Sequence, residues 1–376
     1  MKQTQEEKTE KPLVIVTTGG SGGHIFPAEA IAEALLKKGM RVAFITDKRG
    51  QAFQKLKDIP VYRLMAESVT GKSVFGKMLA AVKLYLGVFQ AGILINKLKP
   101  SVIIGVGGYA SIPAVIAGDF LSKASIVLHE QNAVLGRANR MLARITHRTK
   151  MVATSFCPTM QIPGDVAQIQ VGLPVRPAVM DCQNTPYPKL KDTFHLLIFG
   201  GSQGARFFTT KLPESLLALP KDIRAKIELV QQVRPEDMET AHNFYDTAGF
   251  KKVVLKSFFT DMPEQLQKAH LVIGRGGAGT LTELMVIGRP GIIIPLPTAA
   301  DNHQMENARI FCDKGGGWLV NEKDFNSRIL ATRLEKLITS PELLQEAAHH
   351  AFLQAPKNAA EKMADVVWDV IQGDKK

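Results

Sequence analysis

The order strand, glycine loop, helix occurs twice along this chain. Leu13–Thr17 leads into the loop GGSGGH and a helical pattern, and His195–Phe199 leads into GGSQGA and another helical pattern. Short β-branched runs that alternate with helical patterns are typical of parallel, doubly wound sheets. The sequence therefore predicts an α/β protein with two Rossmann-like domains.

Ten apolar runs carry this prediction. We expect strands at Leu13–Thr17, Val42–Thr46, Val102–Val106, Ser125–Leu128, Met151–Ala153, His195–Phe199, Ile227–Gln231, Val253–Lys256, Leu271–Ile273 and Gly291–Ile294. A proline-rich stretch between the halves has the composition of a linker. The expected boundaries are a flexible tail at 1–11, a first domain at 12–175, a second domain at 176–356, and a C-terminal helix at 357–373 that completes the first domain.

Composition excludes several classes of protein. The 376 residues are 45% hydrophobic and 22% charged, values that exclude a mainly disordered or low-complexity chain. The first eleven residues have no apolar stretch of the kind found in signal peptides, so we expect a cytosolic protein. Cys157, Cys182 and Cys312 lie far apart, without the spacing of a disulfide framework or a zinc site.

The net charge of +12 is confined to the first half. Met1–Arg176 holds 23 basic and 11 acidic residues, and no Asp or Glu occurs between Ser68 and Gly118. Apolar residues in that stretch recur at helical spacing, which predicts a basic amphipathic helix. Such a helix is consistent with a core-facing stripe, an anionic membrane surface or a nucleic acid. The membrane reading would use Lys72, Phe75, Lys77, Leu79, Val82, Lys83, Leu86 and Phe89.

Two further features limit these alternatives. Aromatic residues make up only 7% and no nucleic-acid motif is visible, so we expect no nucleic-acid partner. The longest uncharged run, Pro100–Gly118, is interrupted by prolines and glycines, so the sequence predicts no segment that spans a bilayer. Membrane association would then be peripheral.

The first glycine loop is expected to lie next to an anion or a sugar oxygen. Glycines permit close backbone approach, and the following helix presents free N–H groups. A dinucleotide fingerprint is the rival reading, with Asp47 as the ribose ligand, but Ile25 stands where the third small residue is needed. His24 is suited to act as a general base, or alternatively only shapes the loop.

The segment Gly274–Glu283 is the most informative part of the second half. Its glycines run from a strand into a helix whose free amides can hold a diphosphate, and Glu283 can accept both hydroxyls of a ribose. Arg275 adds a positive charge. Further on, Asp301, Gln304 and Asn307 share a helical spacing; they either read sugar hydroxyls or form a cap and a solvated face. The GGSQGA loop lacks the lysine of a Walker motif.

Taken together, five segments resemble the MurG family of bacterial N-acetylglucosaminyltransferases. They are GGSGGHIFPA, GVGGYAS, LHEQNAVLGRANR, GGSQGAR and SFFTDMP…GRGGAGTLTEL…PLPTAADNHQMENA, and they run in family order from about residue 14 to residue 320. The resemblance implies a GT-B fold, in which two Rossmann-like domains face each other across a cleft. It also implies a transferase that uses UDP-N-acetylglucosamine (UDP-GlcNAc) as donor.

The resemblance assigns roles position by position. The implied catalytic residues are His24, as first choice of base, and Glu130 as second. The implied donor contacts are Ser21, Gly22, Gly23, Asn132, Arg176, Ser202, Arg275, Gly277, Ala278, Thr280, Glu283, Gln304 and Asn307. The implied acceptor side comprises Thr18, Tyr109 and Asn139. The chain departs from the family pattern at Leu173, where the family commonly has asparagine, and at Gly276, where it often has serine.

The implied reaction inverts the anomeric centre. The C4 hydroxyl of the N-acetylmuramyl unit of lipid I, an undecaprenyl diphosphate, attacks UDP-GlcNAc and yields lipid II and UDP for peptidoglycan synthesis. The resemblance places the protein at the cytoplasmic face of the inner membrane, on anionic lipid, with cell-wall synthesis proteins as candidate partners. No paired acidic motif for a metal follows a strand, so neither a metal nor another cofactor is expected.

Two rival functions remain open at the level of sequence. A UDP-GlcNAc 2-epimerase, or a glycolipid transferase with another acceptor, would share the nucleotide-binding residues. A non-catalytic nucleotide-sugar-binding protein would require a crippled site, whereas His24, Glu130, Arg275 and Glu283 are all present.

Overall fold

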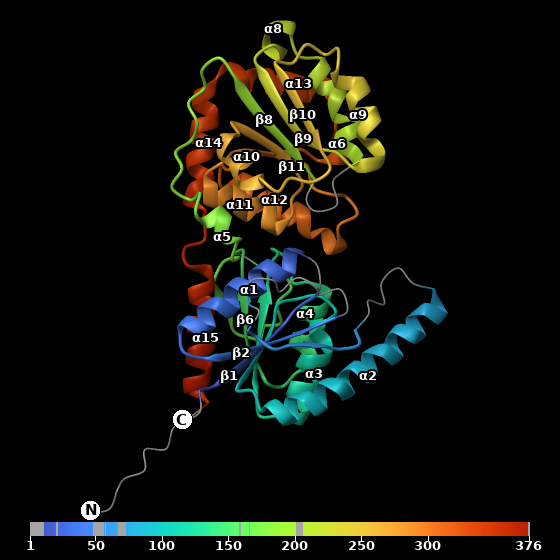
Figure 1. The fold of residues 1–376 in the computed structure, drawn as a ribbon, viewed down its shortest axis with the longest axis vertical. Helices are drawn as coiled ribbons and strands as arrows, with labels where there is room; N and C mark the ends of the chain where they lie inside the picture. The colour runs from blue at the N-terminus through green and yellow to red at the C-terminus, as the bar shows by residue number, and fades with distance from the viewer. Residues whose placement is uncertain are drawn as a thin grey trace, which may run out of the picture. The chain divides into compact units, whose positions relative to one another are not determined.

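The chain forms two α/β units, each with its own parallel sheet, in a computed structural model (Figure 1). The structure describes residues 11–19, 22–47, 56, 58–66, 73–157, 159–164, 166–200 and 206–374, without the side chains of Val74 and Lys77. The first unit comprises Met1–Gln131, Leu135–Pro174 and Asn358–Lys376, and the second comprises Asn132–Val134 and Val175–Lys357. Of the expected tail 1–11, all but Lys11 lies outside the described residues.

The first sheet has the strand order β3-β2-β1-β4-β5-β6-β7, and all its strand pairs are parallel. Its strands are β1 (Leu13–Thr17), β2 (Arg41–Thr46), β3 (Val61–Arg63), β4 (Val102–Gly105), β5 (Ser125–Glu130), β6 (Thr149–Thr154) and β7 (Gln168–Gln170). Its helices are α1 (Gly22–Lys37), α2 (Val74–Leu98), α3 (Ser111–Leu121), α4 (Arg137–Ile145) and the C-terminal α15 (Ala359–Gly373). The doubly wound fold class predicted from the sequence is confirmed.

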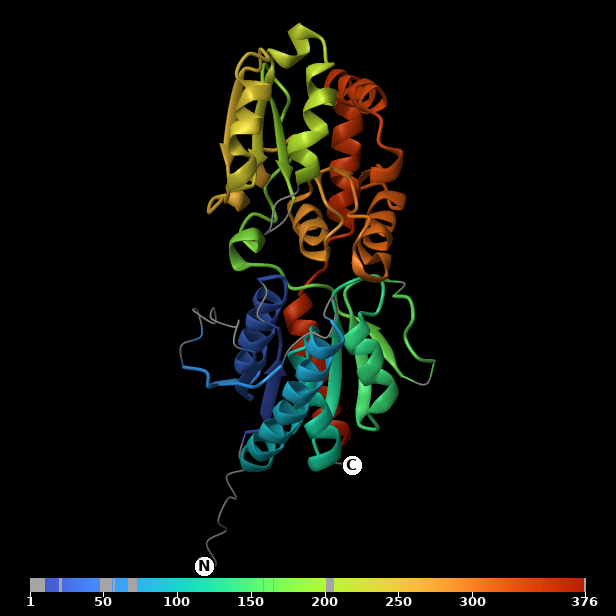
Figure 2. The same cartoon turned by 90° about the vertical axis from the view of Figure 1, so that its right-hand side faces the viewer.

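Alternate residues of β1 face two different cores. Val14 and Val16 pack with α1 and α15, whereas Ile15 packs with α2, α3 and α4. Side chains alternate across a strand, so the five buried residues of β1, four of them apolar, suit a sheet that is covered on both faces. Figures 1 and 2 both show α15 beside α1, and Met363 and Val367 of α15 are buried in that core. The C-terminal helix is therefore part of the first unit.

The second sheet has the order β10-β9-β8-β11-β12-β13, again parallel throughout. Its strands are β8 (Phe194–Phe199), β9 (Ile227–Gln232), β10 (Lys252–Lys256), β11 (Leu271–Gly274), β12 (Gly291–Ile293) and β13 (Gly317–Leu319). Its α-helices are α5 (Pro177–Met180), α6 (Arg206–Thr210), α7 (Leu212–Leu217), α8 (Lys221–Arg224), α9 (Met238–Tyr245), α10 (Met262–Lys268), α11 (Ala278–Ile287), α12 (His303–Asp313), α13 (Ser327–Thr339) and α14 (Pro341–Leu353). Three 3₁₀ turns are η1 (Pro235–Asp237), η2 (Ala300–Asn302) and η3 (Glu322–Asp324).

Local chemistry sets several helix ends. The Ser73 hydroxyl accepts from the Gly76 N–H at the start of α2, and the Asn326 side chain accepts from the N–H groups of Arg328 and Ile329 at the start of α13. Gly288 ends α11 with a φ of 66°, a left-handed conformation that glycine adopts without strain.

Candidate functional site

Each sheet reverses its winding direction at one point. In the first sheet the reversal lies between β1 and β4, and in the second it lies between β8 and β11. Ligands of open parallel sheets bind outside the carboxyl ends of the strands at such a point. Glycine loops singled out from the sequence follow β4 and β11, at the expected ligand-binding ends of the two sheets. Gly20 and Ser21 of the loop after β1, and residues 201–205 of the loop after β8, lie outside the described residues.

The start of α11 is open to a ligand. Gly277 is its N-cap residue and has no side chain that could cap the helix start. Gly279 is exposed and Thr280 half-buried, so the first-turn amides lie near solvent. Unpaired amides and the helix dipole make such a start favourable for an anion. Figure 1 shows α11 and α12 side by side at this end of the second unit.

Glu283 lies on α11 and is paired with Arg176. The Arg176 Nε and Nη2 atoms both donate to Glu283 Oε1, at 3.0 and 2.7 Å. The Glu283 side chain is only 13% exposed. Burial raises the pKa of this carboxyl, and Arg176 acts in the opposite direction by favouring the charged form. The structure thus brings together two of the residues predicted from separate motifs.

Arg275 follows β11 and is buried. Its Nη1 donates to the Ile294 carbonyl at 3.1 Å and forms an ion pair with Glu322. The guanidinium also lies 5.4 and 5.0 Å from the ring centroids of Phe207 and Phe208. These contacts hold the loop between β11 and α11 in place and fix the positive charge of Arg275 there; its contact with the donor stays a prediction.

Gly276 is in close contact with the backbone of the first turn of α12. A Cβ atom at this position would lie 2.2 Å from the Gln304 carbonyl oxygen, a distance that no side chain can adopt without a backbone shift. The Gln304 Oε1 accepts from the Leu296 N–H at 3.0 Å. The glycine that departs from the family pattern is therefore required by this backbone packing.

Asn307 of α12 is fully buried, and its side chain makes three hydrogen bonds. Its Oδ1 accepts from the Ala133 N–H at 2.7 Å, and its Nδ2 donates to Asn132 Oδ1 and to the Gly276 carbonyl, both at 3.0 Å. Asn132–Val134 groups with the second unit for this reason. Burial of Asn307 excludes the solvated-face reading for this residue, and its contact with a sugar hydroxyl stays a prediction.

His24 lies in the first turns of α1, against the loop that follows β4. Gly107 and Gly108 have φ values of 92° and 79°, and a Cβ on Gly107 would lie 3.3 Å from the His24 ring. Burial lowers the pKa of His24, while the Val106 backbone opposes this shift. A lowered pKa keeps the imidazole neutral at neutral pH, which is the state that a general base requires.

The Glu130 side chain is hydrogen-bonded to residues at the start of α4. Its Oε2 accepts from the Gly136 N–H at 2.8 Å and from Asn139 Nδ2 at 3.0 Å. Asn139 also donates to the His129 carbonyl at 3.1 Å. His129 is buried, and burial together with the neighbouring His24 lowers its pKa to about 4. Glu130 and Asn139 thus organise the loop after β5.

The structure describes some of the other predicted residues of the first unit and leaves others out. Thr18 is buried with its backbone N–H on the Ile45 carbonyl, Gly23 lies in the first turn of α1, and Tyr109 is half-buried after β4. Gly22 begins α1. Ser21, Ser202 and Lys72 lie outside the described residues, as does the side chain of Lys77.

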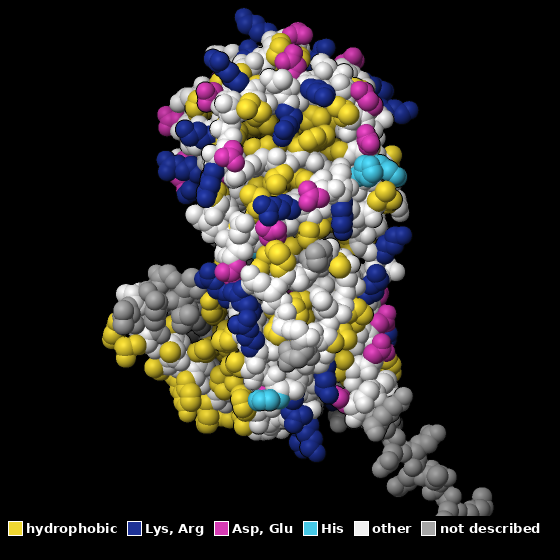
Figure 3. All heavy atoms as spheres, turned by 180° about the vertical axis from the view of Figure 1, so that it is seen from behind, with side chains coloured by type: hydrophobic (Ala, Val, Ile, Leu, Met, Phe, Trp, Pro, Cys, Tyr) yellow, Lys and Arg dark blue, Asp and Glu magenta, His cyan; other side chains and the backbone are white. Residues whose placement is uncertain are grey.

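The α2 helix carries an exposed apolar strip. Phe75 and Tyr85 are 78% and 74% exposed, and the strip also includes Met78, Leu79, Val82, Leu86, Phe89 and Ile93. Phe120 and Leu121, at the end of the neighbouring α3, extend it. Figure 3 shows these hydrophobic side chains gathered over α2. We call this set of residues the α2 strip.

The segment Met78–Leu98 is also long and apolar enough to cross a membrane, with a mean hydropathy of 1.8. This differs from the sequence-based expectation that no segment spans a bilayer. The opposite face of the helix is committed to the first unit, because Ala80, Ala91 and Ile95 are buried in it and Gly87 contacts the Met65 backbone. The helix is thus amphipathic in its packing.

Sequence reasoning missed several residues. Tyr85, Phe120 and Leu121 belong to the α2 strip, and Tyr85 could have been found from its helical spacing. His129 and Glu322 contact predicted site residues through the tertiary fold, and no local pattern marks them. All three cysteines are free, and among the described residues no group of three or more His, Cys, Asp or Glu is arranged to hold a metal.

Comparisons with known proteins agree with this geometry. Residues 14–151 match the glycosyltransferase family 28 N-terminal domain, and residues 195–363 match the glycosyltransferase family 28 C-terminal domain. The crystal structure of Acinetobacter baumannii MurG superimposes with a TM-score of 0.77 at 28% identity, covering 95% of this chain and 99% of that one. The GT-B fold expected from the sequence is confirmed.

Two relatives are similar over nearly their whole length. Both are named UDP-N-acetylglucosamine–N-acetylmuramyl-(pentapeptide) pyrophosphoryl-undecaprenol N-acetylglucosamine transferase. The one from Paramagnetospirillum magneticum is 42% identical over 97% of this chain and 99% of its own. The one from Rhodospirillum centenum is 42% identical over 94% of this chain and 93% of its own. The chain therefore belongs to the MurG family of N-acetylglucosamine transferases, within glycosyltransferase family 28.

Proposed function

We propose that this chain transfers N-acetylglucosamine from UDP-GlcNAc to the C4 hydroxyl of the N-acetylmuramyl unit of lipid I, giving lipid II and UDP. Membership of the MurG family carries this proposal. The paired Glu283 and Arg176 beside an uncapped helix start add a local reason, because they suit a nucleoside diphosphate.

The donor binds at the second unit in this proposal. The diphosphate lies against the first-turn amides of α11, and Glu283 accepts hydrogen bonds from the ribose hydroxyls. Arg176 keeps Glu283 ionised and oriented, because it donates twice to one carboxylate oxygen. Arg275 and Asn307 act as positioning residues for the loop before α11, since their contacts are with protein groups.

His24 is the proposed base. It removes the proton from the acceptor hydroxyl as that oxygen attacks the anomeric carbon, the bond to UDP breaks, and the configuration inverts. The helix dipole and the amides of α11 stabilise the charge that grows on the leaving diphosphate. Glu130 is the weaker candidate, because its Oε2 already accepts two hydrogen bonds at the start of α4. We expect turnover without an added metal.

The α2 strip is the proposed site of peripheral membrane docking. Large exposed apolar residues on one helix face can insert below lipid headgroups, and Lys83, Lys97 and Lys99 lie on or next to the same helix without any Asp or Glu from Ser68 to Gly118. The acceptor is an undecaprenyl lipid in the names of the relatives, so docking would bring the site to its substrate.

Vesicle sedimentation tests the docking surface. Replacing Phe75, Tyr85 and Phe89 with serine should reduce binding to phosphatidylglycerol vesicles at least tenfold. A matched triple variant at Phe258, Ile329 and Leu353, which are exposed in the second unit, should bind like the wild type. Equal loss in both variants would reject the α2 strip as the docking surface.

Mass spectrometry of the lipid product tests the reaction. Incubation with UDP-GlcNAc and lipid I should add one N-acetylhexosamine to the lipid in the presence of EDTA. Conversion of UDP-GlcNAc to its 2-epimer, with no change to the lipid, would instead support the epimerase.

A further inference from the structure

A hollow lies at the end of the second sheet away from the α11 loop, beside the amino ends of β8 and β11. Its volume is about 510 Å³, within the range of small-molecule sites. The lining that concerns us consists of Lys189, Lys191, Lys251, Lys268, His195 and His270. Because parallel strands share their direction, this hollow is separate from the α11 loop at the carboxyl ends.

The rim of the hollow is strongly basic. Four lysines line it, against a single carboxylate, Asp192. None of the four forms an ion pair within the described part of the chain. Lysines gathered around a concave surface repel one another and create a positive potential that favours an anion. The Thr193 hydroxyl lies on the same rim and accepts from Lys251 Nζ.

His270 lies at the floor of the hollow and is 2% exposed. Its Nδ1 accepts from the His195 N–H at 2.9 Å, and its Nε2 is buried, with the Lys189 backbone as the hydrogen-bonding group that favours a proton on the ring. Its ring stacks on those of Phe194 and His195, each at 5.4 Å between centroids. Since Nδ1 accepts, Nε2 carries the proton of the neutral ring and is a donor.

Burial and two neighbouring side chains disfavour a charge on this ring. Burial, the neighbouring His195 and Arg289 lower the pKa of His270 to about 4, while the Lys189 backbone opposes them. The backbone of Lys189 thus lies by the His270 ring, and the residue also lines the hollow.

Arg289 places a buried positive charge behind the floor. It is fully buried, and its guanidinium donates only to backbone carbonyls in the part of the chain that the structure describes. Two of these belong to lining residues: Pro186, at 3.3 Å, and Gln267, at 2.8 Å, both from Nη2. A buried charge is normally paired with an opposite one. The floor and the rim thus share an excess of positive charge.

We infer that this hollow binds a small phosphate-bearing anion. The lysines act as point charges on the phosphate oxygens, above a floor that holds His270 and the buried charge of Arg289. The ligand class is inorganic phosphate or a phosphate monoester of a small metabolite. A lipid headgroup has the same chemistry, so the test separates the two sources.

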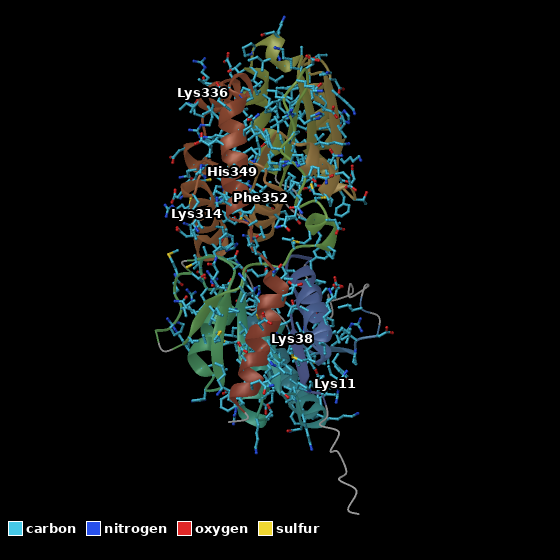
Figure 4. The ribbon with its side chains drawn as sticks, turned by 90° about the vertical axis from the view of Figure 1, so that its left-hand side faces the viewer. Lys11, Lys38, Lys314, Lys336, His349 and Phe352 are labelled. Atoms are coloured by element: carbon cyan, nitrogen blue, oxygen red, sulfur yellow. The ribbon has the colours of Figure 1, made fainter. Side chains whose placement is uncertain are left out.

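Isothermal titration calorimetry with inorganic phosphate tests the site. The full-length protein is first saturated with UDP, which keeps phosphate away from the donor loop, and ionic strength is held constant with chloride. The variant is the double substitution Lys189→Gln with Lys268→Gln. The matched control is Lys314→Gln with Lys336→Gln, two exposed lysines of the same unit that lie on other elements and are labelled in Figure 4.

Binding to the wild type and to the control, with at least tenfold weaker binding to the Lys189 and Lys268 variant, supports the site. The thermal midpoint should then rise by about 2–5 °C at ten times the dissociation constant, in the wild type and control only. The signal of the His270 ring should also shift on titration in nitrogen NMR spectra. Equal binding by both double variants would overturn the inference. So would a variant that loses binding to phosphatidylglycerol vesicles but keeps binding to phosphate, because the anion would then be a lipid headgroup.

Discussion

The guanidinium of Arg176 donates two hydrogen bonds to one carboxylate oxygen of Glu283, a residue 107 positions further along the chain. Arg176 lies within the proline-rich linker, whereas Glu283 lies on the helix whose N-cap is a glycine. The pair therefore connects the segment that joins the two units to the proposed ribose site. Loss of either partner leaves a buried or half-buried charge without its counterpart.

Replacing Glu283 with alanine should weaken donor binding more than it weakens the fold. We expect the dissociation constant for UDP-GlcNAc to rise about 10- to 100-fold, because hydrogen bonds to a charged group contribute about 1.5–3 kcal/mol. Glu239→Ala, an exposed glutamate in the first turn of α9, is the control and should bind like the wild type. Calorimetry gives both constants, and unchanged binding by Glu283→Ala would remove this residue from the site.

Replacing His24 with glutamine should lower kcat by about 10²- to 10⁴-fold with little change in KM for UDP-GlcNAc. Burial lowers the pKa of His24, so the wild-type rate should fall only as pH drops below the ordinary histidine value, where the base becomes protonated. The matched variant is Glu130→Gln, whose amide oxygen can still accept at the start of α4. If Glu130→Gln, rather than His24→Gln, removed the acidic limb of the pH profile, Glu130 would be the base.

Replacing Asn307 with alanine should affect stability and donor binding together. The substitution leaves the Ala133 N–H and the Gly276 carbonyl without their partners, which should cost about 2–4 kcal/mol in the free energy of unfolding. Because Gly276 precedes the start of α11, KM for UDP-GlcNAc should rise as well. Urea unfolding and steady-state kinetics measure the two effects, with the exposed Asn184→Ala as control. A stable variant with a normal KM would contradict the anchoring role.

Acid should destabilise the protein through its buried histidines. The pKa values of His129 and His270 are lowered from 6.5 to about 4 by burial, so their contribution is fully present above pH 6.5. It is lost progressively as pH falls from 6.5 to about 4, at roughly 1.4 kcal/mol per pH unit for each histidine. His270→Asn should reduce this slope in urea unfolding, whereas the exposed His349→Gln should not. A slope that His270→Asn leaves unchanged would contradict the burial argument.

Much of the fold follows from local sequence because the central strands are buried on both faces. Runs such as Leu13–Thr17 are buried throughout and almost entirely apolar, so they are visible in the sequence. The strands β3, β7 and β13 were not predicted. Each has three residues at the edge of a sheet, and the sequences VYR, QIQ and GWL are only partly buried or exposed. Edge strands gain less burial, so their sequences carry less pattern.

Only part of the candidate site can be predicted from local sequence. Glycine loops after strands predict where a ligand binds, because only glycine permits the close approach seen at Gly107 and Gly276. The partners of the site residues cannot be predicted locally: Arg275 pairs with Glu322, and Asn307 bonds to Ala133, 174 residues away. These contacts exist only once the chain has folded, so no local pattern around Arg275 or Asn307 predicts them.

The most direct test of the proposed reaction is the rate of UDP release from UDP-GlcNAc with and without lipid I, in detergent with EDTA. The account predicts release that depends on the lipid, saturates with both substrates, and yields one UDP for each N-acetylglucosamine transferred. Release at the same rate without lipid I, or none with it although UDP-GlcNAc binds, would contradict the proposed transfer to this acceptor.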